Sequence, residues 1–315
     1  MKRHKICKII FAILAVFLCV AFYELIGICI TYKKQPAVSD ATIKETQNIM
    51  SVAGRENTER AVIIEKNSQA LLERVRLIQN AKDEIILSTF AFKSDESGKL
   101  ILGALHDAAD RGVHVRILVD GMESWIDMEG NPYFYGLSSH ENVEIKLYNK
   151  ANPLKPWKTM GRMHDKYLIA DGKIYILGGR NTYNYFLGDF PGHKNFDRDV
   201  LVVCDEPQKD NSVNQLWNYF ETIWEQEDCR YFHNSKKLAD RQSVKKAVLE
   251  LQEGYQQYFE VNKEKICDKD YADETFETEK ITLLSNPIHT QAKEPVVWYQ
   301  LGELMKNAKE RVKIH

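Results

Sequence analysis

The stretch that decides the fold runs from Met163 to Asn181 and reads MHDKYLIADGKIYILGGRN. Two short apolar runs, KYLIA and KIYIL, flank Asp171-Gly172, a dipeptide that strongly favours a hairpin turn. Gly178-Gly179 follows the second run, where glycine permits a tight backbone bend. We therefore predict a β-hairpin with polar residues at both of its ends.

The polar residues of this hairpin are suited to binding a phosphate. His164 and Lys166 are two apart in a predicted strand, so their side chains share one face. Imidazole can attack phosphorus, and a nearby lysine can neutralise phosphate oxygens. The hairpin brings back Gly179 and Asn181, whose backbone and side-chain amides can donate to an anion. A lone strand histidine is usually structural, and Asp171 suits a turn, but the combined spacing favours a phosphate site.

The chain before the hairpin reads as alternating helices and strands. Apolar spacing predicts a helix over Ala70–Asn80 and a second helix that stops at Gly112. Buried strands are predicted over Asp83–Phe92, Val113–Asp120 and Val143–Asn149. Such strand–helix–strand units build parallel or mixed sheets with helices packed on them. The predicted fold class is α/β, a mixed sheet flanked by helices.

The N-terminus carries an apolar stretch long enough to cross a bilayer. Residues 9–32 contain a single charged residue, Glu24, and follow a basic segment, residues 1–8. About 20 apolar residues span a membrane as a helix. A cleaved signal peptide is the alternative, but no small-residue cleavage site follows the stretch directly. We predict a single-pass anchor in the cell membrane, and the excess of basic residues before it places the body outside the cytoplasm.

Charge and cysteine content narrow the function classes. The net charge is −2, and the first 34 residues carry +5, which leaves −7 for the remainder. A mildly acidic body makes nucleic acid an unlikely general partner, because proteins that bind it usually show a basic face. The six cysteines show no CxxC or Cys/His spacing of a metal site.

The hairpin carries a resemblance to a known family. Its pattern HxKx4Dx6GGxN, which begins at His164, resembles the signature of the phospholipase D superfamily. RMHDKYLIADGKIYILGGRNTYNYF, followed by FDRDVLVV, is similar to the bacterial cardiolipin synthase-like branch of that superfamily. The resemblance extends over roughly Ala61–Glu227 and the last thirty or so residues.

The resemblance implies transfer through a phosphohistidine, with no metal or cofactor. One histidine attacks phosphorus and a second protonates the leaving alkoxide. By this resemblance, His164 is the nucleophile or the general acid. Lys166, Gly179 and Asn181 are expected to hold phosphate oxygens.

Three carboxylates are carried over with smaller roles. Asp171 completes the catalytic set of His164 and Lys166 in a supporting role. A carboxylate after the signature would orient the histidine, and Asp199, or as a weaker choice Asp197, lies in that region.

A repeat indicates a second half of the fold. Leu77–Leu87 (LIQNAKDEIIL) aligns with Leu304–Ile314 (LMKNAKERVKI), yet the sequence holds no second HxKx4D. Three interpretations stay open: a truncated chain, two chains that pair their signatures, or a separate second-half partner. We expect a basic segment (1–8), an anchor (9–32), a linker (33–60), a phospholipase D-like half (61–230), a helical connector (231–275) and the incomplete start of a second half (276–315).

The expected substrate is an anionic phospholipid such as phosphatidylglycerol. Residues 146–166 carry a net charge of +5, which would recruit anionic headgroups at a membrane. Aromatic residues in Trp125–Leu137, and Trp157, could lie at the membrane interface. We therefore expect a membrane-anchored phosphatidyltransferase of cardiolipin synthase type. The alternatives are a tethered phosphodiesterase or nuclease that works as a dimer, and a non-catalytic remnant.

Overall fold

The computed structural model describes residues 2–51, 58–267 and 270–311. Within these residues the chain divides into two compact units. Unit 1 contains residues of the ranges 1–51, 151–162 and 284–315, and unit 2 contains residues of the ranges 52–150 and 163–283. The hairpin predicted to carry the chemistry lies in unit 2.

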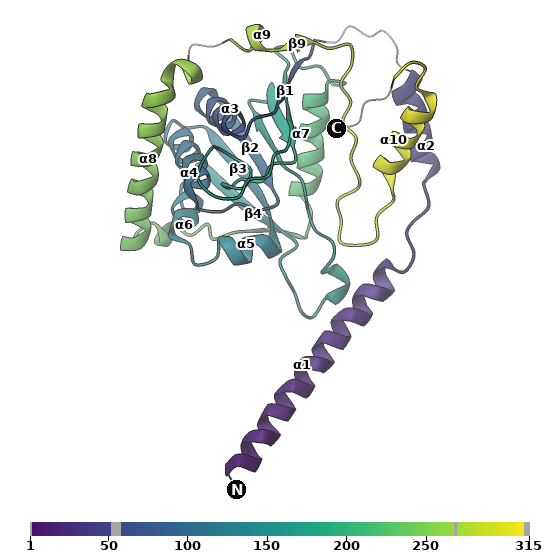
Figure 1. The fold of residues 1–315 in the computed structure, drawn as a ribbon, viewed down its shortest axis with the longest axis vertical. Helices are drawn as coiled ribbons and strands as arrows, with labels where there is room; N and C mark the ends of the chain where they lie inside the picture. The colour runs from purple at the N-terminus through teal and green to yellow at the C-terminus, as the bar shows by residue number, and fades with distance from the viewer. Residues whose placement is uncertain (1, 52–57, 268–269, 312–315) are drawn as a thin grey trace. The chain divides into compact units, whose positions relative to one another are not determined.

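In the described residues, unit 2 is built on one nine-stranded mixed sheet (Figure 1), with the strand order β8-β4-β3-β2-β5-β6-β7-β1-β9. Parallel pairing joins β2 (Glu84–Thr89), β3 (His114–Asp120) and β4 (Val143–Tyr148). The antiparallel strands are β1 (Arg60–Ile64), β5 (Tyr167–Ala170), β6 (Ile174–Gly178), β7 (Asp199–Val203), β8 (Cys229–Tyr231) and β9 (Phe276–Glu277). The predicted mixed α/β fold is confirmed.

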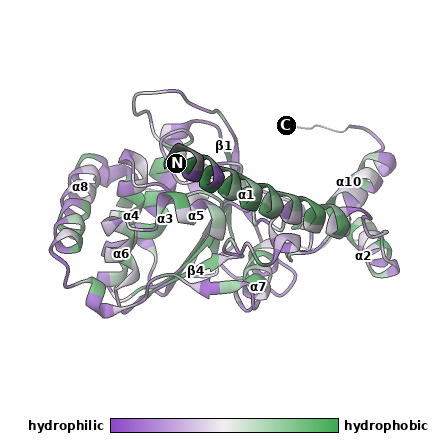
Figure 2. Ribbon diagram, turned by 90° about the horizontal axis from the view of Figure 1, so that it is seen from below, coloured by the Kyte–Doolittle hydropathy of each residue, from purple (hydrophilic) through white to green (hydrophobic). Residues whose placement is uncertain are grey.

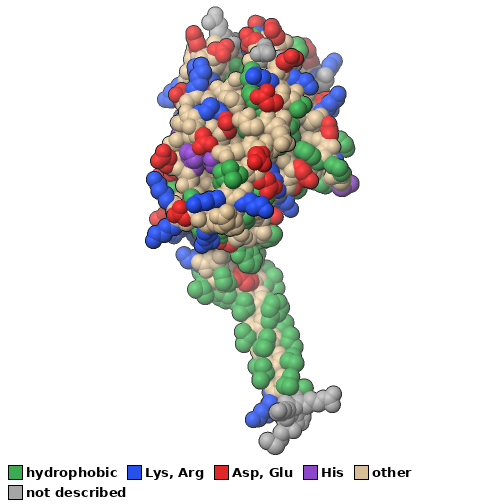
Figure 3. Space-filling view, turned by 90° about the vertical axis from the view of Figure 1, so that its left-hand side faces the viewer, with side chains coloured by type: hydrophobic (Ala, Val, Ile, Leu, Met, Phe, Trp, Pro, Cys, Tyr) green, Lys and Arg blue, Asp and Glu red, His purple; other side chains and the backbone are tan. Residues whose placement is uncertain are grey.

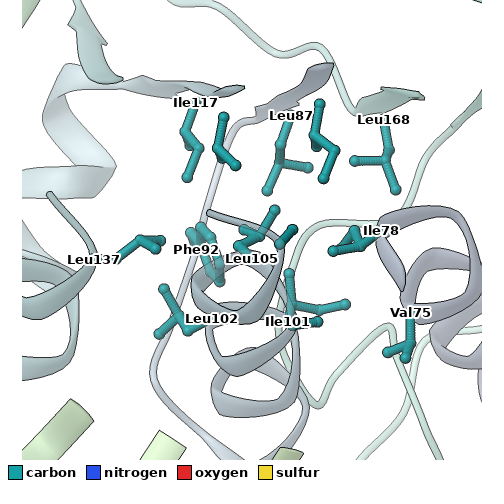
Figure 4. Close-up of a cluster of buried hydrophobic side chains, with 14 of the residues drawn as sticks. Val75, Ile78, Leu87, Phe92, Ile101, Leu102, Leu105, Ile117, Leu137 and Leu168 are labelled. Carbon is teal, nitrogen blue, oxygen red and sulfur yellow. The ribbon is translucent and has the colours of Figure 1, made fainter. Parts of the chain in front are cut away.

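Helices cover the first face of this sheet, where the main core lies (Figure 4). They are α3 (Asn67–Asn80), α4 (Glu96–Asp110) and α6 (Pro132–Ser138), and α8 (Gln242–Cys267) packs on the outside of these three helices. Alternate strand residues such as Leu87 and Ile117 point into this core because side chains alternate along a strand. Ile78 and Leu105 point towards them from α3 and α4, and Leu102 belongs to the same core.

The second face of the sheet is covered by α7 (Ser212–Trp224). Arg116 of β3 lies there, bonded to Glu84 and Glu221 and stacked near the ring of Trp217. Pairing with two carboxylates compensates the loss of water around this buried guanidinium. Short elements complete the unit: α5 (Gly121–Asp127), η2 (Lys236–Leu238) and α9 (Tyr271–Glu274).

Two segments expected outside the first half belong to unit 2. In the expected connector, 231–275, α8 buries Leu251 and Tyr255 in the main core. In the expected start of a second half, Phe276–Glu277 forms β9 and pairs with β1. Apolar burial explains the first difference, because α8 has an apolar stripe that is stable only when covered.

Unit 1 holds α1 (Lys2–Tyr32), α2 (Asp40–Ser51), η1 (Pro156–Lys158) and α10 (Val296–Asn307). Lys5–Tyr32 is long and apolar enough to cross a membrane, although a signal sequence would pass the same test. Figure 2 colours most of this helix as hydrophobic, and Figure 3 shows hydrophobic side chains along it. α10 ends at Asn307, as α3 ends at Asn80, in line with the repeat. The last part of the repeat, up to Ile314, which aligns with β2, lies mostly outside the described residues.

Candidate active site

The predicted hairpin forms as expected. β5 and β6 pair antiparallel, and Lys173 N donates to the Ala170 carbonyl at 3.0 Å across the turn. Asp171 and Gly172 have φ of 52° and 61°, and two central residues at positive φ are the mark of a type I′ turn. Aspartate tolerates this region better than most residues, and glycine adopts it freely.

His164 lies just before this hairpin, at the edge of the sheet where β2 and β3 end. The Met163 amide donates to Asp120 Oδ2 at 3.2 Å, which fixes the start of the segment against the last residue of β3. The His164 side chain is exposed, and its ring meets the edge of Phe90 with 4.6 Å between centroids. One side of the imidazole therefore packs against Phe90, and another side is open to solvent.

Lys166 is buried beside it. Its Nζ donates to the His164 carbonyl at 2.6 Å and lies 5.3 Å from the centre of the Phe90 ring. β5 begins only at Tyr167, so the prediction that His164 and Lys166 belong to the strand is corrected. The Lys166 carbonyl accepts from Gly178 N, the amide of the last residue of β6. The hydrogen bonds between β5 and β6 therefore run out at Lys166, and His164 lies beyond them. The two side chains still share a face, since both contact Phe90.

Asn181 is brought to the same place by the other strand of the hairpin. Its Oδ1 accepts from the Ala91 amide at 3.2 Å, and Thr182 pairs with the backbone of Ala91 and Lys93. With Oδ1 engaged, Nδ2 is the atom of this amide that can donate to a phosphate. His164, Lys166 and Asn181 are thus gathered around Phe90–Ala91.

The paired glycines allow two carboxylates to approach the end of β6. A Cβ on Gly178 would overlap Asp199, and a Cβ on Gly179 would overlap Asp197. The glycines are therefore needed for close approach, since neither is among the positive-φ residues of the described chain.

Asp199 and Asp197 differ in their surroundings. Asp199 is buried and forms ion pairs with Arg74 at 2.9 Å and Arg180 at 3.3 Å. These contacts suit a structural role, because a buried carboxylate is stable only when paired. Asp197 is half-buried, and its charge acts on Lys166. Neither is among the charges that act on His164.

The carboxylate that acts on His164 is Asp120, which sequence reasoning missed. Its charge raises the pKa of His164, although burial and the charge of Lys166 lower that pKa more. Asp120 is fully buried and also accepts from Met122 N and Glu123 N at the start of α5. Its position at the end of a strand parallel to β2 was the available signal, because such strand ends gather at one edge.

Both titrating groups favour their neutral forms more than usual. Burial lowers the pKa of Lys166 to about 8, against the opposing charges of Asp165 and Asp197. The lowered pKa of His164 keeps its imidazole neutral at pH 7, the form that can act as a nucleophile. Coupled shifts of this kind are typical of functional sites.

Asp171 is not brought to this place. It lies at the far end of β5 from His164, and its carboxylate accepts from the backbone amides of Lys82, Asp83 and Glu84 at 2.8–3.2 Å. These contacts tie the hairpin turn to the loop between α3 and β2. The supporting catalytic role stays a prediction that no contact with His164 or Lys166 supports, and among the described residues no three His, Cys, Asp or Glu side chains form a metal-ligand group.

Comparison with known proteins identifies the domain that carries this site. Residues 75–224 match the family model described as cardiolipin synthase, PLD-like domain. An uncharacterized protein of Helicobacter pylori (strain ATCC 700392 / 26695) is 33% identical over 53% of this chain and 35% of its own length. Cardiolipin synthase C of Escherichia coli (strain K12) is 29% identical over 44% of this chain and 31% of its own length.

A solved structure is also similar. Nuc from Salmonella typhimurium, a phospholipase D family member, is 21% identical and aligns with a TM-score of 0.39 over 56% of this chain and 99% of its own length. The chain spans about a third of the length of the curated relatives named above. The family match covers strands β2 to β7 and the signature, so residues 75–224 are similar to a phospholipase D-like domain.

Proposed function

We propose that the chain is a membrane-anchored phosphatidyltransferase of cardiolipin synthase type that acts through a phosphohistidine on His164. The observation that carries this proposal is the grouping of an exposed imidazole, a buried lysine and a fixed asparagine around Phe90–Ala91. The similarity to cardiolipin synthases supports a phospholipid substrate. In this proposal the anchor is α1, the body lies outside the cytoplasm, and the donor is an anionic phospholipid such as phosphatidylglycerol.

The first step makes His164 the nucleophile. The neutral ring attacks phosphorus, a nitrogen–phosphorus bond forms, and the bond from phosphorus to the departing alkoxide breaks. The lowered pKa of His164 favours the unprotonated ring that this step requires. Lys166 and Asn181 stabilise the charge that develops on the phosphate oxygens, with the backbone of Gly179 as a further donor.

A second acid is needed in the same step. A ring bonded to phosphorus cannot also deliver a proton to the departing oxygen, and the nearby Asp199 is engaged in ion pairs with Arg74 and Arg180. We propose that the acid is a histidine from a second signature-bearing domain, in a second copy of this chain or in a separate chain. An acceptor alcohol then attacks the phosphohistidine, gives its proton to that group, and releases His164.

The test is phosphatidyl transfer by the full chain in phosphatidylglycerol bilayers. Labelled phosphatidylglycerol should yield a new labelled phospholipid, and acid-labile label should become bound to the wild-type protein and not to His164→Ala. Activity per chain should rise with protein concentration if two copies complete the site. Cleavage of DNA with a steep loss on added salt, and no lipid product, would indicate the phosphodiesterase instead.

A further inference from the structure

A short segment of unit 1 leads directly into the site and has the composition of a membrane-interface element. This interface segment, Ala151–Arg162, reads ANPLKPWKTMGR and contains three basic residues and no acidic one. Leu154, Trp157 and Met160 expose 77%, 41% and 59% of their surface. Basic residues interleaved with exposed aromatic and apolar ones suit an anionic bilayer surface.

The interface segment contacts α1 within the same unit. Thr159 Oγ1 donates to Glu24 Oε2 at 3.3 Å, and Tyr23 OH donates to the Leu154 carbonyl at 3.4 Å. Gly27 has no room for a side chain, because a Cβ there would overlap the ring of Pro156. Two hydrogen bonds and the close packing of Pro156 on Gly27 therefore hold the segment against the later part of the apolar helix.

The position of Glu24 along α1 determines how deep its carboxylate would lie in a bilayer. The charge-free part of α1 before it, from Ile9 to Tyr23, is about 22 Å long at about 1.5 Å per residue. The hydrocarbon layer is about 30 Å thick, so Glu24 would lie past its middle and nearer to the boundary that follows the helix in the chain. A charged group there costs less than at the bilayer centre, and its side chain can extend towards that boundary.

The chain length between the two units limits how far the site can lie from that boundary. Thr159 and His164 are five residues apart, so their Cα atoms are separated by at most about 18 Å, the length of the fully extended chain. This bound holds whatever the arrangement of the two units. The imidazole of His164 is therefore tethered within reach of the headgroup layer, where lipid phosphates lie.

We propose that the interface segment binds the headgroup layer of an anionic phospholipid bilayer and so presents lipid phosphates to His164. The proposal rests on the proposed function for the identity of the substrate, but the contact itself can be measured without turnover. Lys155, Lys158 and Arg162 provide the charge that complements anionic headgroups, and Trp157 provides the amphipathic ring that prefers the interface. The competing binding partner for this exposed surface is a second copy of the chain.

Tryptophan fluorescence tests the contact directly. Because α1 contains no tryptophan, the membrane-spanning helix itself contributes no signal that a lipid label could quench. The full chain is placed in phosphatidylglycerol nanodiscs that carry a spin label near the glycerol end of an acyl chain. The label should quench the wild type, and Trp157→Phe should remove most of the quenchable signal. Trp298→Phe is the matched control, because Trp298 is exposed on α10 of the same unit and outside the segment. Unchanged quenching in Trp157→Phe, or a sedimentation shift of that variant towards smaller species, would overturn the proposal.

Charge removal tests the function of the contact. The double variant Lys155→Gln/Lys158→Gln should raise KM for bilayer phosphatidylglycerol by about fivefold per residue, while kcat/KM for a soluble short-chain phosphodiester stays unchanged. Lys236→Gln/Lys245→Gln is the control, since both lysines are surface residues of unit 2. Equal losses in both double variants would refute a specific contact. Quenching at Trp157 without any lipid turnover would uphold the contact and refute the proposed function.

Discussion

The two ends of the β5–β6 hairpin carry polar residues of one signature, yet they have different surroundings. At the turn, the Asp171 carboxylate accepts from three backbone amides of the loop before β2. At the open end, the His164 ring is exposed, and Lys166 is buried with a pKa lowered to about 8. At the turn end the polar groups are hydrogen-bonded within the chain. At the open end, His164 and Lys166 have lowered pKa values and lie next to solvent.

This difference separates residues that hold the hairpin from residues that act on a ligand. A carboxylate with several backbone donors stabilises the folded state. A buried ammonium bonded to a single carbonyl is costly unless an anion completes its surroundings. We therefore propose a structural role for Asp171 and a phosphate-binding role for Lys166, and the following variants test that division.

The largest effect is expected at the open end. In any active assembly, His164→Ala should lower kcat by at least about 10⁴-fold, because the nucleophile is lost. Unfolding of the variant, followed by circular dichroism, should match the wild type, since the His164 side chain is exposed. Residual turnover close to that of the wild type would remove His164 from the mechanism.

Lys166→Met should have the next largest effect. Methionine keeps most of the apolar volume beside Phe90 and removes the charge, so kcat/KM should fall by about 10²–10³-fold, as for the loss of one preorganised contact to the transition state. The variant should also be at least as stable as the wild type, because a buried charge is removed. A large loss of stability with unchanged kinetics would reverse the assignment and make Lys166 the structural residue.

Sequence reasoning succeeded where local chemistry decides the structure. Asp171-Gly172 predicts its turn because both residues accept positive φ, and apolar periodicity predicts the strands that flank it. Asn181 could be placed near His164 because a hairpin brings its two ends together. These inferences need only a few neighbouring residues.

It fell short where partners come from distant segments. The pairing of Asp199 with Arg74 and Arg180 depends on how the start of β7 packs against α3 and against the segment after β6. The action of Asp120 on His164 depends on how β3 lies beside β2 and on the entry of the chain at Met163. No pattern of neighbouring residues encodes such contacts, and the one signal for Asp120, its position at the end of a predicted strand, is weaker than the family signature that directed attention to the segment after it.

At the turn end, we expect a loss of stability without a loss of chemistry. Asp171→Gly keeps the positive φ but removes the carboxylate that accepts hydrogen bonds from three backbone amides. The free energy of unfolding should therefore fall by about 2–3 kcal/mol. Asp171→Asn retains one acceptor oxygen and should lose less. Denaturant unfolding measures both variants. A variant of wild-type stability with strongly reduced kcat would instead support the catalytic role that the family signature assigns to Asp171.

The smallest expected effect is in the pH dependence of kcat/KM, which separates the roles of the carboxylates at the open end. Activity should fall on the acid side as His164 gains a proton, below its usual pKa of about 6.5 because that pKa is lowered. It should fall on the alkaline side near pH 8, where Lys166 loses its charge.

Asp197→Asn removes a charge that raises the pKa of Lys166, so the alkaline limb should move to lower pH while the acid limb stays in place. Asp120→Asn removes a charge that raises the pKa of His164, so the acid limb should move to lower pH instead. Because Asp120 also caps α5, its effect should be compared at temperatures well below unfolding. A shift of the acid limb by Asp197→Asn would show that Asp197 acts on the histidine, as the sequence predicted, and would place the orienting carboxylate after the signature.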